Sequence, residues 1–574
     1  MSFIERAKGW LSSPKIAPFV PKSVVCLMEG YTKKILLSDL SAGITVGVIS
    51  LPLAMAFSIG AGLDPERGLY TAIVAGFLTS IFGGSRFLIG GPTGAYVILI
   101  FGILQKFGYE GLVCATIQAA ILLFLLGVLR CGGLIRFISY PVIVGFTCGL
   151  AVVLVSSQIN DLFGLQIPHP TVDIVDRIAG AFQYSSTINY YAVGISLATL
   201  GLIILFRRIS KKFPGVIVAI CIVTAVTYFF GFPVETIESK FGIIPRSLPS
   251  PHWPPISFDL IRKTFPDAVG IALLGAIESL LACVIADSLA GTRHKSNCEL
   301  IGQGISNFGS AVCGGIPATG AIARTTASMQ LHAKTPLAGI IHAFTLLILM
   351  LVLAPWASMV PLAALAAVLV VVAWGMFEIE QLKEVVKGGR GEALVLLVTV
   401  AITILVDINT AVQTGVFLSI ILFLKRSSEA TTGKLLEAIE ADEHISDKDT
   451  DLSGSWQMAL PPDTKVYEIE GPFFFAVADL LADVLNHFDP LPSTLIVRMR
   501  SVPFIDSTAV NALRRFAVQC KSKHVELFLA ELKPNVRTYL KHSDFFRTFP
   551  KDHVVASLDQ ALRPASVSTN MPIG

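Results

Sequence analysis

Apolar runs long enough to cross a lipid bilayer recur along the first 427 residues of this 574-residue chain. A membrane-spanning helix needs about 20 consecutive and mostly apolar residues. Hydrophobic residues make up 53% of the chain and charged residues only 15%, against about 25% charged in an ordinary globular protein. These features exclude a disordered chain and a simple soluble enzyme, and they predict a polytopic α-helical membrane protein. Candidate runs lie near residues 41–60, 68–84, 111–129, 135–157, 190–206, 214–231, 269–289, 299–313, 336–356, 362–376, 393–408 and 411–424.

Charge and cysteine content restrict the partners that the chain could have. The net charge of +3 is too small to indicate a nucleic-acid partner. Nine cysteines lie mostly inside apolar runs and form no C-x-x-C pair, so the sequence predicts neither a disulfide framework nor a zinc site. We therefore expect no metal and no cofactor.

Two short segments differ from the long apolar runs because glycine and proline interrupt them. They cover residues 89–96 and 314–325, and their prolines, Pro92 and Pro317, are 225 positions apart. Interrupted segments at matching places in two halves of a chain indicate the binding site of a transporter built from inverted repeats. Counted as half-helices, they bring the total to about fourteen segments, seven before the long 232–265 connection and seven after it. The alternative is a pair of ordinary turns between helices.

The distribution of basic residues predicts the orientation of the chain in the membrane. With the N-terminus inside, short loops on the cytoplasmic side carry about thirteen Lys or Arg residues, and short loops on the other side carry three. This bias fits the positive-inside rule. It predicts both termini in the cytoplasm, with a basic amphipathic region over residues 1–38 lying at the membrane surface.

The composition changes after residue 427. Residues 428–462 are polar and acidic and are interpreted as a linker, residues 463–565 as a small soluble domain, and residues 566–574 as a tail. In the domain, strand-like runs alternate with helix-like runs, which is typical of a mixed sheet with helices packed against it. The strand-like runs are 465–470, 495–499 and 526–530, and the helix-like runs are 476–488, 507–523 and 534–541.

Glu278 is the sharpest chemical feature of the predicted membrane domain. The charged residues nearest to it are Asp267 and Asp287, eleven and nine positions away. At 1.5 Å per helical residue, its carboxyl group lies about 13–16 Å from either end of the run. An acidic residue at that depth costs about 2–3 kcal/mol and marks a functional site by default. Glu278 is therefore the candidate for proton coupling, and a structural link between helices is the alternative.

Arg324 falls in the first turn of the second half-helix. The N-terminus of a helix offers unpaired N–H groups and a positive dipole end, which together favour anions. A guanidinium adds a cationic fork to such a site. The first half-helix would present Thr93, Gly94 and Ala95 from the opposite side. We expect an anion between the two N-termini; the alternative is that Arg324 extends to the membrane interface.

At these residues the sequence resembles the sulfate permease and sulfate-anion transporter family. The likeness covers nearly the whole chain, and the C-terminal part is similar to the family's STAS domain. The stretches that carry it are Asp39–Ala56, Gly68–Tyr70, Gly84–Arg86, Gly91–Thr93, Glu278–Leu281 and, in the soluble domain, Val502–Thr508.

The resemblance implies a seven-plus-seven inverted repeat with core and gate domains, a cytoplasmic STAS domain and a homodimer. It also implies that the anion lies between the third and tenth segments, below side chains of the first. Glu278 matches the acidic residue that the family uses in coupling. The implied substrate-binding residues are Leu53, Phe57, Thr93, Gly94, Ala95, Ala323, Arg324 and Thr325.

Details of the resemblance bear on the substrate and the coupling ion. Sodium-coupled bicarbonate members look to carry Asp at the position of Glu278 and a hydroxyl residue four positions later, where this chain has Ala282; protons are therefore favoured over sodium. Residues 275–281, 291–297, 302–304 and 321–324 look most similar to a bacterial branch that includes a C4-dicarboxylate carrier. Ser507 stands where related regulatory domains are phosphorylated, and capping of its helix is the alternative role.

The sequence thus predicts a secondary active anion transporter of the inner membrane and not an enzyme. We expect proton-coupled transport of a C4-dicarboxylate or sulfate by alternating access. A bicarbonate or sulfate carrier or exchanger, an anion channel on the same fold, and a receptor that signals through the STAS domain are the alternatives. The expected partners are a small inorganic or organic anion, protons, the lipid bilayer, a second copy of the chain and a protein bound by the STAS domain.

Overall fold

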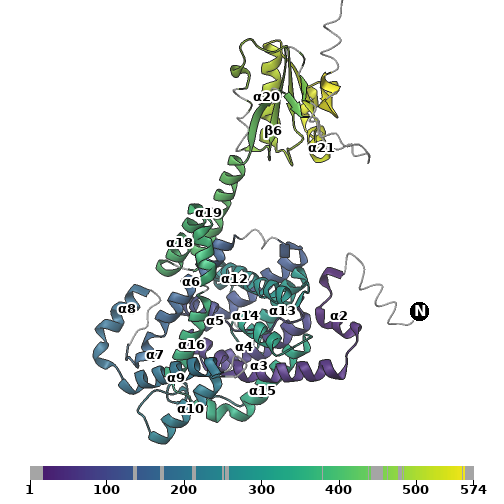
Figure 1. The fold of residues 1–574 in the computed structure, drawn as a ribbon. Helices are drawn as coiled ribbons and strands as arrows, with labels where there is room; N and C mark the ends of the chain where they lie inside the picture. The colour runs from purple at the N-terminus through teal and green to yellow at the C-terminus, as the bar shows by residue number, and fades with distance from the viewer. Residues whose placement is uncertain are drawn as a thin grey trace, which may run out of the picture. The chain divides into compact units, whose positions relative to one another are not determined.

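The computed structural model describes residues 17–133, 139–167, 174–209, 215–247, 251, 257–377, 379–406, 408–436, 438–440, 457–459, 461, 463–475, 481, 484–558 and 560–562. Contacts divide the chain into two units, Met1–Ser419 and Ile420–Gly574 (Figure 1). Each unit has its own buried apolar cluster.

The first unit is helical. Its helices are α2 (Lys22–Glu29), α3 (Lys33–Gly60), α4 (Pro65–Phe82), α5 (Gly94–Val128), α6 (Tyr140–Ser157), α7 (Ile159–Phe163), α8 (Ile174–Gln183), α9 (Tyr190–Ile209), α10 (Gly215–Phe230), α11 (Ile237–Phe241), α12 (Phe258–Ala290), α13 (Ser296–Val312), α14 (Ile322–Gln330), α15 (Leu337–Ser358), α16 (Leu362–Met376), α17 (Ile379–Lys387), α18 (Arg390–Leu405) and the first part of α19 (Ile408–Glu429). The 3-10 turns η1 (Ala17–Phe19) and η3 (Ser185–Thr187) and two short strands complete it.

Local sequence explains where the long helices begin, bend and end. Thr32 and Ser257 accept hydrogen bonds from backbone N–H groups in the first turns of α3 and α12, as capping residues do. α12 ends at Gly291, which adopts the left-handed conformation. α5 contains a non-helical residue, Gly108 (φ 66°), so it consists of two helical segments joined end to end.

The number of membrane segments agrees with the prediction of about fourteen. With α5 divided at Gly108, and with the short helices α7, α8, α11 and α17 set aside, seven segments run from α3 to α10 and seven from α12 to α19 in the part that the structure describes. Six helices among these residues are long and apolar enough to cross a bilayer by themselves; they begin at Lys33, Gly94, Tyr140, Phe258, Leu337 and Leu362.

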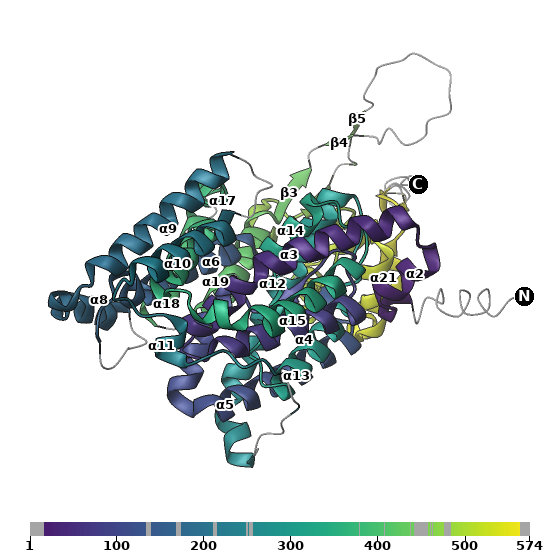
Figure 2. The ribbon, with the colours of Figure 1, turned by 90° about the horizontal axis from the view of Figure 1, so that it is seen from below.

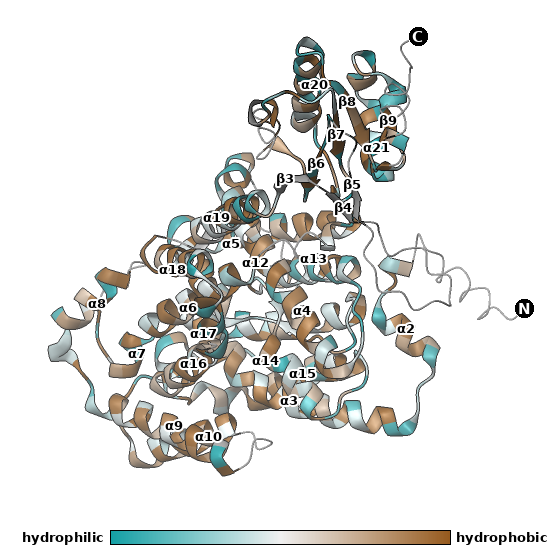
Figure 3. Cartoon of the chain, turned by 45° about the horizontal axis from the view of Figure 1, so that its top comes forward, coloured by the Kyte–Doolittle hydropathy of each residue, from teal (hydrophilic) through white to brown (hydrophobic). Residues whose placement is uncertain are grey.

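Two groups of helices make up this unit. The core group consists of α3, α4, α5, α12, α13, α14 and α15, which pack closely on one another, and α3 lies beside α15 (Figure 2). The gate group contains α6, α9, α10, α16 and α18. α16 joins the groups because it contacts α3 and α5 of the core as well as α6 and α9. Helices α9 and α10 are coloured largely as hydrophobic (Figure 3). Tyr228 and Phe229 of α10 are largely exposed, as expected of a lipid-facing surface.

The second unit is an α/β domain. Its sheet has the order β3-β6-β7-β8-β9; β3 runs antiparallel to β6 and the other neighbours are parallel. The helices α20 (Ser507–Ser522) and α21 (Pro534–His542) share one apolar cluster with the sheet. The strands are β3 (Thr432–Leu436), β6 (Thr464–Glu470), β7 (Thr494–Arg498), β8 (Glu526–Ala530) and β9 (Val554–Val555), with β4 (Ala438–Glu440) and β5 (Gln457–Ala459) as a separate pair.

Two parts of this domain differ from the prediction. Strands β3, β4 and β5 fall inside the region 428–462 that the sequence assigned to a linker. β3, with the sequence Thr-Gly-Lys-Leu-Leu, is an edge strand that pairs only with β6 among the described residues, so it lacks the continuous apolar signature of an inner strand. The predicted helix 476–488 contains the 3-10 turn η5 (Val484–His487), and its residues 476–480 and 482–483 lie outside the described part.

Candidate anion site at the crossing of two half-helices

Two short strands cross at the centre of the core group. β1 (Gly90–Gly91) pairs antiparallel with β2 (Thr319–Gly320). α5 begins at Gly94 and α14 at Ile322, directly after these strands. Since the strands are antiparallel, the two helices start at opposite ends of the crossing, and the N–H groups of both first turns are directed toward it. The crossing therefore places two positive helix ends close together.

Helix α12 supports the crossing from behind. The hydroxyl groups of Ser279 and Thr319 lie 2.8 Å apart, and the N–H of Gly320 donates to the Ser279 hydroxyl at 2.9 Å. The Thr319 hydroxyl also contacts the carbonyl of Gly275 at 3.2 Å. A side chain at Gly90 would meet the Thr79 hydroxyl at 2.4 Å, so the strand can pass here only as glycine. These contacts fix the positions of both half-helices.

Glu278 faces the N-terminus of α5. The hydroxyl of Thr93, the N-cap residue of that helix, donates to Glu278 Oε2 at 3.2 Å. The same hydroxyl caps no backbone N–H of α5; the N–H of Tyr96 donates to the carbonyl of Thr93 at 3.2 Å, which leaves the N–H groups of Gly94 and Ala95 for a ligand. Thr93 and Glu278 are both half-buried rather than sealed. The acid and the positive helix end thus border the same space.

Arg324 lies at the crossing, but its orientation differs from the expected fork toward the anion. Its side chain is 3% exposed, and Nη2 donates to the carbonyl of Pro92 at 3.1 Å. A Cβ added at Gly91 would lie 2.1 Å from Nη1, and Nη1 is buried without a hydrogen-bond partner in the described structure. The guanidinium therefore sits behind the start of the first half-helix and adds positive charge there.

The other predicted binding residues divide into those with an accessible surface and those that are buried. Ala323 is exposed and Leu53 is half-buried, so both keep surface that a ligand could contact. Gly94 and Phe57 are buried where core meets gate: a Cβ at Gly94 would lie 3.4 Å from Phe57 and 3.3 Å from Leu154 of α6.

Two of the predicted binding residues, Ala95 and Thr325, have side chains that are not accessible to a ligand. Ala95 is 2% exposed, and Thr325 is fully buried with its hydroxyl accepting from the N–H of Ile89 at 3.2 Å. Thr325 therefore holds the crossing together instead of facing a ligand.

Sequence reasoning missed several buried polar groups of the core. Ser279 and Thr319 were not singled out, although Ser279 directly follows Glu278. Glu299 is fully buried and accepts from the N–H of Gly84 at 2.8 Å and from Gln303 at 2.9 Å. Glu299, Gln303 and Asn307 stand four positions apart on α13, and this spacing is a signal that could have revealed the buried carboxylate. His342 is also fully buried, and its only signal was its place in an apolar run.

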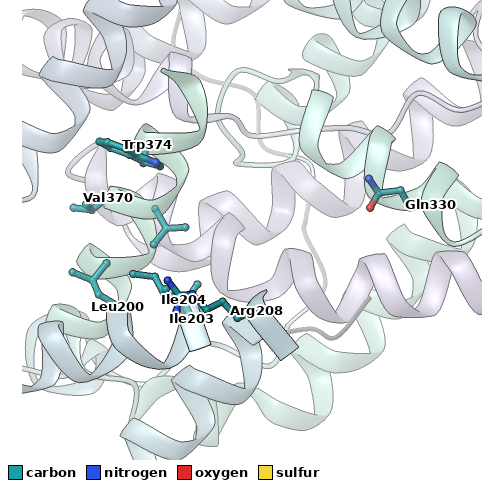
Figure 4. A pocket seen from close by; sticks show the side chains of 8 residues that line it. Leu200, Ile203, Ile204, Arg208, Gln330, Val370 and Trp374 are labelled. Carbon is teal, nitrogen blue, oxygen red and sulfur yellow. The ribbon is translucent and has the colours of Figure 1, made fainter. Parts of the chain in front are cut away.

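A cavity of about 820 Å³ lies between the two groups of helices. Gln330, the last residue of α14, stands on one side, and Val370 and Trp374 of α16 and Leu200 and Arg208 of α9 stand on the other (Figure 4). The walls are mostly apolar, with Arg208 and Gln330 as polar groups. It follows that the C-terminal end of the second half-helix borders an open space against the gate.

Comparisons with known proteins agree with this architecture. The profile of the sulfate permease family matches residues 36–399, and that of the STAS domain matches residues 455–561. A putative sulfate transporter of Bacillus subtilis, YvdB, is 37% identical over 92% of this chain and 97% of its own length. The bicarbonate transporter BicA of a Picosynechococcus species is 29% identical over 92% of this chain and 94% of its own length.

Solved structures show the same fold. The murine Solute Carrier 26 family member A9 anion transporter, in an inward-facing state, superposes with a TM-score of 0.84 at 20% identity, over 97% of this chain and 95% of that one. The transmembrane domain of a cyanobacterial BicA superposes with a TM-score of 0.60 at 29% identity, over 68% of this chain and 98% of that one. The chain is therefore a multi-pass membrane protein that belongs to the sulfate permease family of anion transporters and carries a STAS domain.

Proposed function

We propose that this protein is a secondary active transporter that carries a small oxyanion, sulfate or bicarbonate, together with a proton. The observation that carries the proposal is the hydrogen bond from Thr93 to Glu278 at the N-terminus of α5. It places a titratable carboxyl group at the end of a helix that favours anions.

Charge explains how the two ligands would be coupled. The helix ends and the buried charge of Arg324 attract an anion, whereas an ionised Glu278 at the same place repels it. Protonation of Glu278 removes the repulsion, and a bound anion in turn favours the proton, because coupling between two ligands is reciprocal. The loaded site then carries less net charge while it moves through the membrane.

The names of the relatives guide the choice of substrate. YvdB is described as a putative sulfate transporter and BicA as a bicarbonate transporter, and the dicarboxylate expected from short stretches of sequence has no support in these comparisons. Sulfate and bicarbonate are compact oxyanions that accept hydrogen bonds from the first-turn N–H groups of both half-helices. Succinate is kept as a third probe.

Alternating access would move the core group past the gate group. Gly94 of the core lies against Leu154 and Met376 of the gate, so the two groups would move along this surface. The cavity bordered by Gln330 and Arg208 would serve as the route to one side of the membrane. The basic loops predict that this side is the cytoplasm.

The proposal is tested by uptake of labelled sulfate, bicarbonate and succinate into proteoliposomes at two external pH values, with and without sodium. The wild type should show saturable uptake of sulfate or bicarbonate that is driven by external acid and indifferent to sodium. Glu278→Gln should abolish the acid-driven component. Glu299→Gln is the matched control, because that buried carboxylate serves Gly84 and Gln303 instead of the open space.

Other results would contradict the proposal. Unchanged pH dependence in Glu278→Gln removes the coupling role. Current without saturable, gradient-driven uptake identifies a channel. Uptake of succinate alone restores the dicarboxylate expectation.

The assembly and location implied by the resemblance remain predictions. We propose a homodimer in the inner membrane with cytoplasmic termini, and a STAS domain that is available to a cytoplasmic protein partner or to phosphorylation at Ser507. Light scattering in detergent would test the assembly, and labelling of cysteines introduced at the two ends of the chain on intact cells would test the orientation.

A further inference from the structure

We propose that the STAS domain contains a second anion site, a pocket between α20 and α21 that binds a phosphate or sulfate group. The pocket has a volume of about 410 Å³, and six of its seven lining side chains are polar. They are Ser507, Val510, Asn511, Arg514, Tyr539, His542 and Ser543.

The pocket contains a fixed cation and no carboxylate. Arg514 supplies the positive charge, and both Arg514 and His542 come from helices that share one apolar cluster with the sheet. Residues 507–525 include four Lys or Arg residues and no Asp or Glu, and residues 532–543 include three and likewise no Asp or Glu. The potential over both helices is therefore positive.

The acidic residues next to the pocket residues in the sequence already have hydrogen-bond or ion-pair partners. Asp506 accepts from the N–H groups of Ala509 at 2.8 Å and Phe475 at 3.0 Å. Asp544 pairs with Arg547 at 3.1 Å. Neither carboxylate lines the pocket.

Arg514 gives an independent indication of a ligand. Its Nε is buried, and the described part of the chain offers it no hydrogen-bond partner. A buried donor without a partner is unfavourable, and the planar guanidinium matches the geometry of a phosphate or sulfate. An oxyanion in the pocket would satisfy this donor.

The remaining groups are arranged to add hydrogen bonds. His542 Nδ1 lies 2.8 Å from the carbonyl of Thr538, so Nδ1 carries a hydrogen, and Nε2 donates to an oxyanion only when it carries a second hydrogen. Asn511 and Ser507 border the pocket from the first two turns of α20. The ligand would be either the transported oxyanion or a phosphorylated metabolite. Occupancy of the STAS pocket would then depend on the concentration of that ligand in the surrounding solution.

The test uses the full chain in detergent and follows hydrogen–deuterium exchange of backbone amides. Sodium phosphate and sodium sulfate are added separately, with sodium chloride at equal ionic strength as the reference. We expect one of the two oxyanions to slow exchange in residues 507–514 and 539–545. The ion that protects identifies the source of the ligand, and amides of the transport site are read separately.

Arg514→Gln should weaken this protection, raising the concentration for half-maximal effect about 10-fold or more, as expected when a charge-assisted hydrogen bond is lost. Arg515→Gln is the matched control, because Arg515 is exposed and lies outside the pocket. If exchange without anion shows that Arg514→Gln is unfolded, Asn511→Ala at an exposed position takes its place, with a loss of several-fold expected. Absence of protection by both anions, or equal loss in the Arg514 and Arg515 variants, would overturn the proposal.

Discussion

Replacement of Arg324 by methionine separates the electrostatic role of this residue from a structural one. Methionine keeps much of the side-chain volume and removes the charge. Arg324 is 3% exposed, and its one hydrogen bond in the described structure runs to the Pro92 carbonyl at 3.1 Å. The guanidinium thus lies one residue before the N-cap of α5, behind the proposed anion.

The size of the effect follows from this placement. Two unit charges about 6 Å apart at an effective dielectric constant of about 20 attract by about 3 kcal/mol, which corresponds to about 100-fold in affinity. Loss of the hydrogen bond to Pro92 costs about 1.5–3 kcal/mol of stability. Burial of the guanidinium without a carboxylate partner costs several kcal/mol, and the substitution removes this cost. Folding should therefore change little while anion affinity falls strongly.

The assay combines uptake kinetics with thermal unfolding of the same preparations. Arg324→Met should raise the KM for labelled sulfate or bicarbonate about 100-fold and leave the melting temperature close to that of the wild type. Arg67→Met is the control, because Arg67 stacks on Tyr109 at 3.6 Å, pairs with Asp64 at 3.5 Å and donates to the carbonyl of Gly314, five residues before β2, at 3.3 Å; it should lower stability and preserve KM. A folded Arg324→Met protein with normal KM would refute the electrostatic role.

Three further substitutions test other parts of the account. Thr93→Val removes the hydroxyl that donates to Glu278 at 3.2 Å, and should shift the pH dependence of uptake while the protein stays folded; an unchanged pH profile would exclude Thr93 from coupling. Gly91→Ala places a Cβ 2.1 Å from the buried guanidinium at φ +152°, and should lower both transport and melting temperature, whereas Gly102→Ala, whose Cβ meets nothing within 4 Å, should change neither. Burial raises the pKa of Glu468 above its ordinary value of 4.5, so its ionised form is less favourable in the folded domain than in the unfolded chain. Glu468→Gln should therefore raise the free energy of unfolding above the folded-state pKa, and this increase should vanish as pH falls below about 4.5. An increase of equal size at all pH values would contradict the expectation.

Much of the membrane fold could be predicted because its signals are long. Runs of about 20 apolar residues are distinctive, and the paired glycine and proline segments located the crossing of β1 and β2. Glu278 was found because a carboxylate stands out in an apolar run. These signals depend on the residue itself and not on what it touches.

The orientation of side chains could not be read from the sequence. Arg324 turns toward Pro92 because the glycine at position 91 leaves room for its guanidinium. The hydroxyl of Thr325 holds the crossing together because it accepts a hydrogen bond from the N–H of Ile89, 236 residues earlier. Both facts depend on long-range pairing.

In the soluble domain, too, elements with a clear pattern in their own residues were predicted, and an element defined by its pairing was not. Strands β6, β7 and β8 each bury apolar residues and were predicted within one residue at each end. β3 gave no such signal, because its five residues pair with a single neighbour.

The location of a bound anion tests the central claim most directly. A structure of the protein determined with selenate, a sulfate analogue whose selenium scatters anomalously, would show where the ion sits. We predict a single site within hydrogen-bond distance of the first-turn N–H groups of α5 and α14, beside Thr93 and Glu278. Selenate bound elsewhere in the membrane domain, for example only in the cavity lined by Arg208 and Gln330, would contradict the account.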